Sequence, residues 1–367
     1  MVAVSSAYST SSYYKAAASA QAAGATSTST AATGSTTEQA ATSVTLSDEA
    51  LAALADRTFA TVISDARAKL TTLLTEADRT SPLEGGKLAL DLTSLDAREL
   101  FAMASDDSFT PDEREAAGLE MQRRFEAALS GPAAIAEVTG NFTALYKAAA
   151  EYLDSLGLEE KAGTDWIAGR AAITEAQKQL QIAPKTMPDA GEDDPVALYL
   201  ALVEAGKSAQ PQDIADVATG ARKTLDALYA DAIKTGKVPT FNKNTTIGTY
   251  IDMSKFGSRT LSAIVLDKTG QFTDQEVSAA NTAMRGKSGA ALLAGFQNAA
   301  KSSDPTAFSQ NIMSLFASMT SEERQAAGWS DQFYQAAVQS YQTTTKLMDM
   351  FAQAGGGNTG FLSWLGK

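Results

Sequence analysis

The sequence repeats itself, and this internal repeat constrains the fold more than any other feature. Residues 90–100 align with residues 251–261 at an offset of 161, and residues 109–113 align with residues 272–276 at an offset of 163. The agreement continues through the pairs Arg98 and Arg259, Ala116 and Ala279, Ala117 and Ala280, Met121 and Met284, Glu159 and Glu322, and Trp166 and Trp329. A pattern that recurs at one spacing indicates one structural unit used twice.

Apolar residues recur mostly at helical spacing within both copies, which predicts helices. We expect helices near residues 47–79, 94–104, 111–130, 132–156, 164–181, 195–205, 211–235, 254–265, 273–285, 287–301, 305–318 and 330–353, with a short strand pair possible within 238–250. The expected fold is therefore all-α, with two tandem related helical units after a disordered N-terminal tail. Breaks at proline and glycine predict five segments: a tail (1–46), repeat unit 1 (47–183), a linker (184–194), repeat unit 2 (195–353), and a glycine hinge with an aromatic tail (354–367).

Composition excludes several classes of chemistry. The chain has 367 residues, of which 44% are hydrophobic, enough for two domains with a sizeable core. It has no cysteine and no histidine. Zinc sites of the usual Cys/His kind, disulfides and histidine-based acid–base mechanisms are therefore excluded. We expect no cofactor.

The net charge of −13 argues against polyanionic partners. Nucleic-acid binding needs a basic footprint, and no basic run or stripe is present. No apolar run approaches the roughly 20 residues of a membrane-spanning helix. The N-terminus also lacks the basic and apolar regions of a cleavable secretory signal, so we expect neither a membrane span nor signal cleavage.

The first 46 residues are mainly Ala, Ser, Thr and Gly, and such a segment buries too little apolar surface to offset its ordering entropy. It can be a flexible tail or an uncleaved export signal, because it resembles the N-termini of flagellar and other type III secretion substrates. Order is expected from Ser47, a candidate N-cap. Leu46, Ser47, Glu49 and Ala50 form a Leu-Ser-x-Glu-Ala segment that resembles one in flagellar anti-sigma factors and neighbouring flagellar proteins.

The region before Phe272 resembles a degenerate EF-hand. With Phe272 at the eighth loop position, Asp267, Thr269 and Glu276 occupy the third, fifth and twelfth positions, and Gly270 provides the turn. The first ligand position, normally Asp, is Val265, and the equivalent loop of copy one also lacks the glycine. The resemblance implies a weak calcium site at Asp267, Thr269 and Glu276.

The same residues also fit a structural pattern that needs no metal. Thr110 with Glu113, and Thr273 with Glu276, have the spacing of a capping box, in which a threonine and a glutamate satisfy the backbone amides at a helix start. Phe109 and Phe272 precede these caps, where a buried hydrophobic staple belongs. We favour this interpretation. Thr320 and Glu323 repeat the pattern.

Two further features of the repeat favour structural roles. Asp91 with Arg98, and Asp252 with Arg259, recur at a seven-residue spacing and predict a salt bridge or a cap. The two matched tryptophans are expected to be core anchors.

No catalytic motif is present, so we expect no enzyme. The favoured function is a non-catalytic interaction or structural protein of a bacterial cell-surface or flagellar-type export system, cytoplasmic before export without cleavage. A calcium-responsive helical binding module and a carboxylate-based hydrolase remain alternatives. A candidate partner-binding segment follows the C-terminal glycines, with apolar residues Phe361, Leu362, Trp364 and Leu365. The partner would be a protein of unknown identity.

Overall fold

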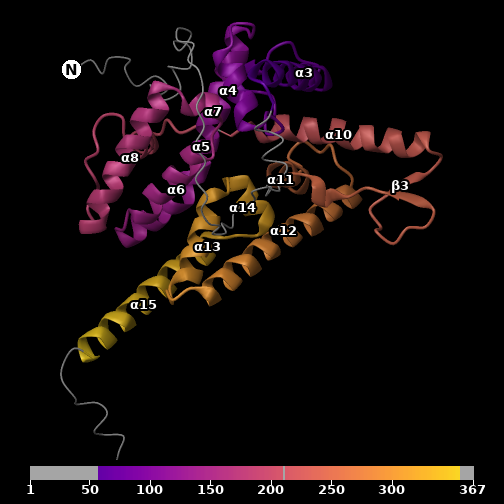
Figure 1. Cartoon of the computed structure of the whole chain (residues 1–367). Helices are drawn as coiled ribbons and strands as arrows, with labels where there is room; N and C mark the ends of the chain where they lie inside the picture. The colour runs from indigo at the N-terminus through magenta and orange to yellow at the C-terminus, as the bar shows by residue number, and fades with distance from the viewer. Residues whose placement is uncertain (1–56, 210, 356–367) are drawn as a thin grey trace, which may run out of the picture.

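The structure, a computed structural model, describes residues 57–209 and 211–355 and is all-α, as predicted (Figure 1). The described elements are α3 (Phe59–Ala77), β1 (Leu83–Glu84), β2 (Lys87–Leu88), α4 (Ala97–Ser105), α5 (Pro111–Thr139), α6 (Thr143–Asp154), α7 (Leu158–Lys161), α8 (Thr164–Ile182), α9 (Pro195–Glu204), α10 (Ile214–Lys234), β3 (Val238–Thr240), β4 (Gly248–Tyr250), the 3-10 turn η2 (Met253–Lys255), α11 (Ser258–Leu266), α12 (Asp274–Lys301), α13 (Ala307–Ser318), α14 (Ser321–Ala327) and α15 (Asp331–Gly355). Among these helices, none combines the length and hydropathy that crossing a membrane requires. The predicted tail (1–46), Ser47 and the aromatic residues 361–365 lie outside the described residues.

The order of the elements recurs along the chain. A helix, two short strands and five further helices (α3 to α8) are followed, after α9, by the same succession from α10 to α15, with η2 added. Helices α4 and α11 both have nine residues, and α6 and α13 both have twelve. We call α3–α8 the first unit and α10–α15 the second unit. The matching order agrees with the repeat in the sequence, while a common origin by duplication stays a prediction.

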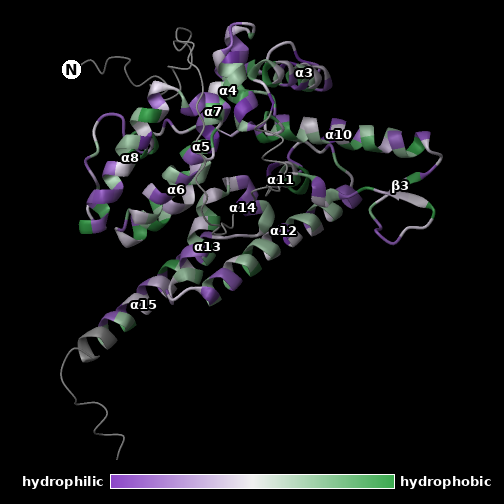
Figure 2. Ribbon diagram, in the orientation of Figure 1, coloured by the Kyte–Doolittle hydropathy of each residue, from purple (hydrophilic) through white to green (hydrophobic). Residues whose placement is uncertain are grey.

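The core is built from the inward faces of these helices. In the first unit α3, α4 and α5 share one cluster of buried apolar residues, and α5, α6 and α8 share another. Helix α9 adds Val196 and Tyr199 to this second cluster. Figure 2 shows apolar and polar residues interleaved along each helix, as expected for helices with one buried face.

The two units are joined where α5 crosses α13. Ile135 and Val138 of α5 pack against a buried cluster that includes Met313 and Phe316 of α13. Gly131 makes this approach possible, because a Cβ atom there would lie 2.1 Å from the Ser314 hydroxyl. Backbones approach this closely only where one side chain is absent.

The capping interpretation of the repeat is confirmed. Thr110–Glu113, Thr273–Glu276 and Thr320–Glu323 each form the reciprocal bonds of a capping box. Phe109 and Phe272 are buried directly before the first two caps. The sequence did not reveal the fourth box, Asp96 with Glu99, at the start of α4.

Several predicted boundaries were wrong. We expected a break near Pro132 and another near Gly286, but α5 and α12 run through these residues as single helices. A proline removes one backbone hydrogen bond, and tertiary packing such as that of α5 on α13 can outweigh this loss. The β1–β2 hairpin was also missed, whereas the second strand pair, β3–β4, lies where it was expected and is parallel.

Candidate functional site

An arginine from α3 stabilises the cap at the start of α5. The guanidinium carbon of Arg67 in α3 lies 3.9 Å from the centroid of the Phe109 ring. Its Nη1 lies 3.2 Å from Oε2 of Glu113, and its Nη2 donates to the Ser108 carbonyl. The arginine therefore holds α3 against the start of α5.

The second unit repeats this arrangement with Arg222 of α10. Its guanidinium carbon lies 5.6 Å from the centroid of the Phe272 ring, and its Nη1 lies 2.8 Å from Oε1 of Glu276. The Tyr229 hydroxyl donates to the same oxygen at 2.6 Å. Burial acts to raise the pKa of Glu276, but the hydrogen bonds from Tyr229, Thr273 and Arg222 hold it below its ordinary value.

These contacts occupy Glu276, the twelfth residue of the candidate calcium loop. Oε1 of Glu276 accepts from Arg222 and Tyr229, and its Oε2 accepts from the backbone and hydroxyl of Thr273. Asp267 accepts a hydrogen bond from the Gln271 amide, and Thr269 is exposed. Within the described part of the chain no group of three or more carboxylates is placed to hold a metal ion. The structure therefore gives Glu276 a role in the cap.

One of our two predictions was that Arg98 pairs with Asp91 and Arg259 with Asp252. Neither ion pair is formed. Arg98 binds Glu159, 61 residues further on, with Nε to Oε2 at 2.7 Å, and Arg259 binds Glu322 with Nη1 to Oε2 at 3.2 Å. Asp91 instead caps its own turn by accepting from the amide and hydroxyl of Thr93. Asp252 does the same with Ser254.

The matched tryptophans differ in burial. Trp329 is buried beside α13 and α15, whereas Trp166 is half-buried and donates from Nε1 to the Leu153 carbonyl at 2.9 Å. Both pack against a core cluster, so the expected anchoring role is met more fully in the second unit.

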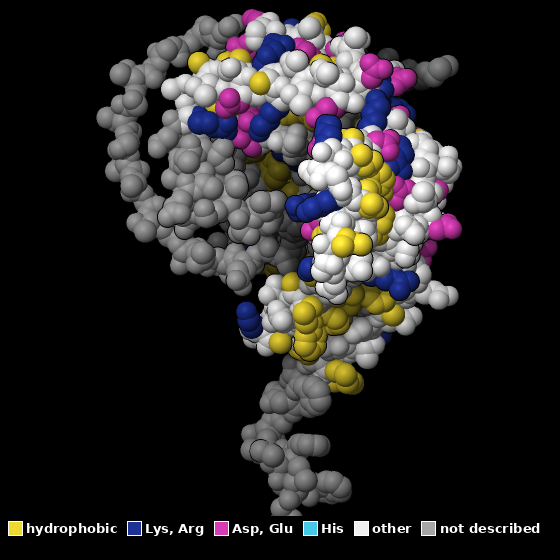
Figure 3. Space-filling model, turned by 90° about the vertical axis from the view of Figure 1, so that its right-hand side faces the viewer, with side chains coloured by type: hydrophobic (Ala, Val, Ile, Leu, Met, Phe, Trp, Pro, Cys, Tyr) yellow, Lys and Arg dark blue, Asp and Glu magenta, His cyan; other side chains and the backbone are white. Residues whose placement is uncertain are grey.

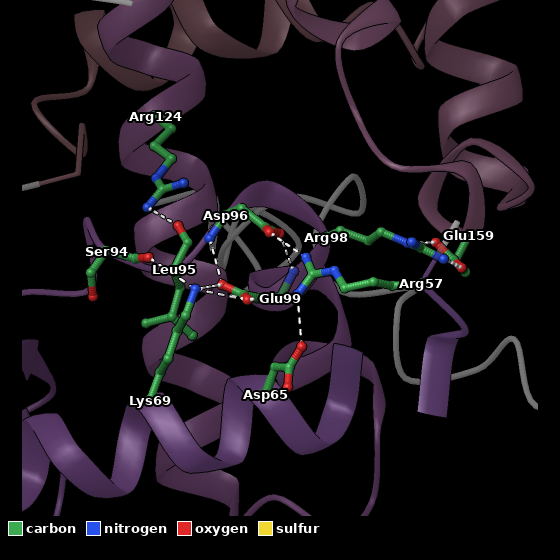
Figure 4. Close-up of polar contacts among 10 residues, drawn as sticks. All are labelled: Arg57, Asp65, Lys69, Ser94, Leu95, Asp96, Arg98, Glu99, Arg124 and Glu159. Atoms are coloured by element: carbon green, nitrogen blue, oxygen red, sulfur yellow. Dashed lines mark hydrogen bonds and ion pairs between the residues drawn. The ribbon is translucent and has the colours of Figure 1, made fainter. Parts of the chain in front are cut away.

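A dense ion-pair network lies at the start of α4 (Figure 4). Glu99 is fully buried and lies 2.7 Å from Nζ of Lys69 and 3.4 Å from Nη1 of Arg57. It also completes the capping box with Asp96. Each charge has an opposite partner, so the network ties α3 to α4 and offers no free group for catalysis.

A second charged cluster extends this network onto α5. Glu120 is nearly fully buried and pairs with Arg123 and Arg124, each at 2.7 Å. Arg124 also donates from Nη2 to the carbonyls of Leu92 at 3.0 Å and Leu95 at 2.9 Å. Figure 4 shows Arg124 reaching the Leu95 carbonyl across the turn before α4. We call Glu120, Arg123 and Arg124 the α5 charge cluster.

The second unit has a hollow at the corresponding position. Counted from the capping glutamates Glu113 and Glu276, the places of the α5 charge cluster are taken by Ala283, Gly286 and Lys287. Here a groove of about 990 Å³ opens between α12 and the segment that contains β3 and β4. We call it the α12 groove. Its lining includes Phe241, Lys243, Tyr250, Asp252, Met253, Asp274, Ala283, Gly286 and Lys287.

The strands also contribute to the difference. The β1–β2 hairpin packs directly on α5, and the Ser81 hydroxyl near its start contacts Oδ2 of Asp112 at 2.9 Å. The β3–β4 pair packs mainly on α10. Figure 3 shows the face of the molecule from which the β3–β4 pair projects, and hydrophobic side chains gather towards the lower end of this face. The exposed apolar residues Leu293 and Phe296 of α12 and Phe308 of α13 lie beyond the α12 groove.

The sequence analysis missed this site because the groove results from side chains that are absent. The available signal was a stretch of mostly small residues between Ala279 and Ala290, in which we expected one helix to end at 285 and the next to begin at 287. The groove combines aromatic side chains with charges of both signs. Its chemistry is suited to binding an extended segment with mixed polarity.

One buried carboxyl stands apart from these pairs. Glu160 of α7 is 8% exposed, and its Oε2 has no hydrogen-bond partner among the described residues. Burial raises its pKa to about 8. Its match in the second unit, Glu323, belongs to the Thr320 capping box, whereas residue 157 of the first unit is glycine and offers no cap hydroxyl. Glu160 therefore has the position of a capping glutamate without the cap.

Comparisons of this chain with protein families, with curated proteins and with solved structures found no match.

Proposed function

We propose that this protein is a non-catalytic binding protein whose α12 groove takes up an extended segment of a protein partner. The contrast between the units carries the proposal. In the first unit the β1–β2 hairpin packs on α5, and the α5 charge cluster forms ion pairs along the same helix. On α12 the matched positions are small or singly charged, and the groove lies open.

The proposal predicts that one substitution on α12 abolishes binding and that a neighbouring one does not. Gly286 lines the groove, whereas Gly289, also exposed on α12, does not. A Cβ atom on either residue would meet nothing within 4 Å, so both positions accept a side chain. Gly289→Arg is therefore a matched control for Gly286→Arg.

The experiment is a selection of displayed random octapeptides on the full-length protein. We expect peptides that bind the wild-type protein and Gly289→Arg but not Gly286→Arg, because the new side chain fills the groove. If no selected peptide distinguishes the two variants, the α12 groove is not the binding site.

We further propose, from the N-terminal sequence, that the protein belongs to a bacterial cell-surface or flagellar-type export system and is cytoplasmic before export. The Ser/Thr/Ala-rich residues 1–46 and the Leu46–Ala50 segment support this assignment. Deleting residues 2–46 should abolish export into the medium in cells with an intact type III apparatus. Unchanged export of the shortened chain would refute the assignment.

The apolar residues Phe361, Leu362, Trp364 and Leu365 remain a predicted second contact for a partner. Truncation after Gly355 should then weaken partner capture and leave the melting temperature unchanged. A clear fall in melting temperature would instead show that these residues pack on the protein itself.

The two alternative functions have less support. A calcium-responsive module would need Glu276 to leave Arg222 and Tyr229 before it could bind an ion. A hydrolase would need two free carboxylates facing a cleft. Of the two aspartates that line the α12 groove, Asp252 already accepts two hydrogen bonds from Ser254.

A further inference from the structure

The first unit shows what the α12 groove lacks. Seven, ten and eleven residues beyond the capping glutamate, α5 carries Glu120, Arg123 and Arg124. The same positions of α12 carry Ala283, Gly286 and Lys287. Only one of the three charges is kept, the cation at the last position. The missing pair is one carboxylate and one guanidinium.

The aspartate whose charge acts on this cluster in the first unit has a counterpart in the second unit. In the first unit the pKa of Arg123 is raised mainly by its hydrogen bond to Glu120, and the charges of Asp91 and Glu323 act in the same direction. Asp252 occupies the same turn as Asp91 and makes the same two bonds to the residue two places on. Asp252 lines the groove and makes no ion pair with any described residue.

Lys287 is likewise left without the partner that its counterpart has. Arg124 is held by Glu120 and by two backbone carbonyls. Lys287 lines the groove and has Ala283 four residues before it, where α5 has the glutamate. The lining also contains Lys243 and Asp274, so its formal charges balance. An arginine that binds towards Asp252 would leave Lys287 in excess unless the ligand also brings an acid.

We propose that the partner segment carries an arginine and an acidic residue that together replace Arg123 and Glu120 in the α12 groove. The guanidinium faces Asp252 and the ligand carboxylate faces Lys287. In an extended segment, residues two apart point to the same side, so the two groups lie at positions i and i+2. This inference rests on the proposed function, because it specifies the ligand of the same groove.

The octapeptide selection described above separates the two claims. Enriched peptides that distinguish Gly286→Arg from Gly289→Arg, and that carry arginine and Asp or Glu two residues apart, support both claims. Enrichment of peptides without this pair overturns the inference but leaves the binding function standing. Absence of any peptide that distinguishes the variants overturns both.

Matched peptides then assign each charge to its partner in the groove. We expect replacement of arginine by citrulline to weaken binding about 5–20-fold, as for a partly exposed charge-assisted pair. Asp252→Asn should weaken the arginine peptide by a similar factor and leave the citrulline peptide unchanged. Lys287→Met should act in the same way only on peptides with the acid, and not on those with glutamine.

Equal losses for charged and neutral peptides would show that the substitutions disturb the groove as a whole. That result would overturn the pairing. Circular dichroism of each variant at the titration temperature, with Gly289→Arg as reference, confirms that the fold is retained.

Discussion

The first and second units share a succession of elements, but the corresponding faces of their long helices differ. On α5 this face carries three interlocked charges and a hairpin, whereas on α12 it carries small residues beside a groove. The arginine that clamps the helix start is present in both units. The two units therefore share the contacts at the helix caps, whereas the residues in the middle of the long helix differ between them.

The strongest test of the shared caps removes the aromatic residue in front of each one. Phe109→Ala and Phe272→Ala should each destabilise the protein by about 3–5 kcal/mol, because both rings are buried and lie near an arginine. Chemical denaturation measures the free energy of unfolding. Losses that differ by several kcal/mol would show that the two caps are not equivalent.

The next test concerns the crossing of α5 and α13, where the units touch through a glycine. Gly131→Ala should destabilise by about 1–3 kcal/mol, because the new Cβ would clash with Ser314 of α13. The control is the matched residue of α12, Ala294, which lies 18 residues beyond its capping glutamate as Gly131 does. Ala294→Gly should cost about 1 kcal/mol through helix propensity alone. A stabilising effect of Gly131→Ala would refute the close crossing of α5 and α13.

Glu160 and Glu323 should respond differently to pH. Because burial raises the pKa of Glu160 to about 8, its protonated form is favoured in the folded state. Its contribution to stability is present below the ordinary value near 4.5 and is lost as the pH rises through about 8.

Glu160→Gln should therefore stabilise the protein by roughly 1–3 kcal/mol at pH 9 and have little effect at pH 4. Glu323→Gln, which alters a satisfied cap, should cost about 0.5–1 kcal/mol near neutral pH. Thermal unfolding across this pH range measures both effects. A Glu160→Gln variant with the same pH profile as the wild type would contradict the raised pKa.

The smallest expected effect comes from rebuilding the α5 charge cluster on α12. The triple variant Ala283→Glu, Gly286→Arg, Lys287→Arg should be more stable than Gly289→Arg by about 0.5–1 kcal/mol, beyond the shared gain in helix propensity. Thermal denaturation of the two variants gives the difference. No gain over the control would show that the turn before α11 does not present the acceptors found before α4.

Most local features of this fold could be predicted from the sequence, although the β1–β2 hairpin and the Asp96–Glu99 capping box were missed, whereas the distant contacts could not be predicted. The capping boxes and the buried Phe109 and Phe272 were predictable because each depends on residues within four positions of one another. The partner of Arg98 was not, because Glu159 becomes adjacent only when α4 and α7 pack together. The continuity of α5 through Pro132 depends in the same way on its contact with α13.

The candidate site was harder still to predict. A groove is defined by the surfaces around an empty volume, and no residue type is characteristic of it. Gly286 and Ala283 acquire meaning only when α12 is compared with α5 in three dimensions. The sequence drew attention instead to Glu276, which is the most recognisable residue of the region and is already fully engaged.

The crossing of α5 and α13 also has a consequence during synthesis on the ribosome. Ile135 and Val138 lie in the first unit, yet the buried residues that cover them, such as Phe316, are made about 180 residues later. At the usual 5–20 residues per second this delay lasts roughly 10–40 s. For that time a nascent chain presents an apolar strip of α5 to the cell, and it is during this interval that chaperones and aggregation would compete for it.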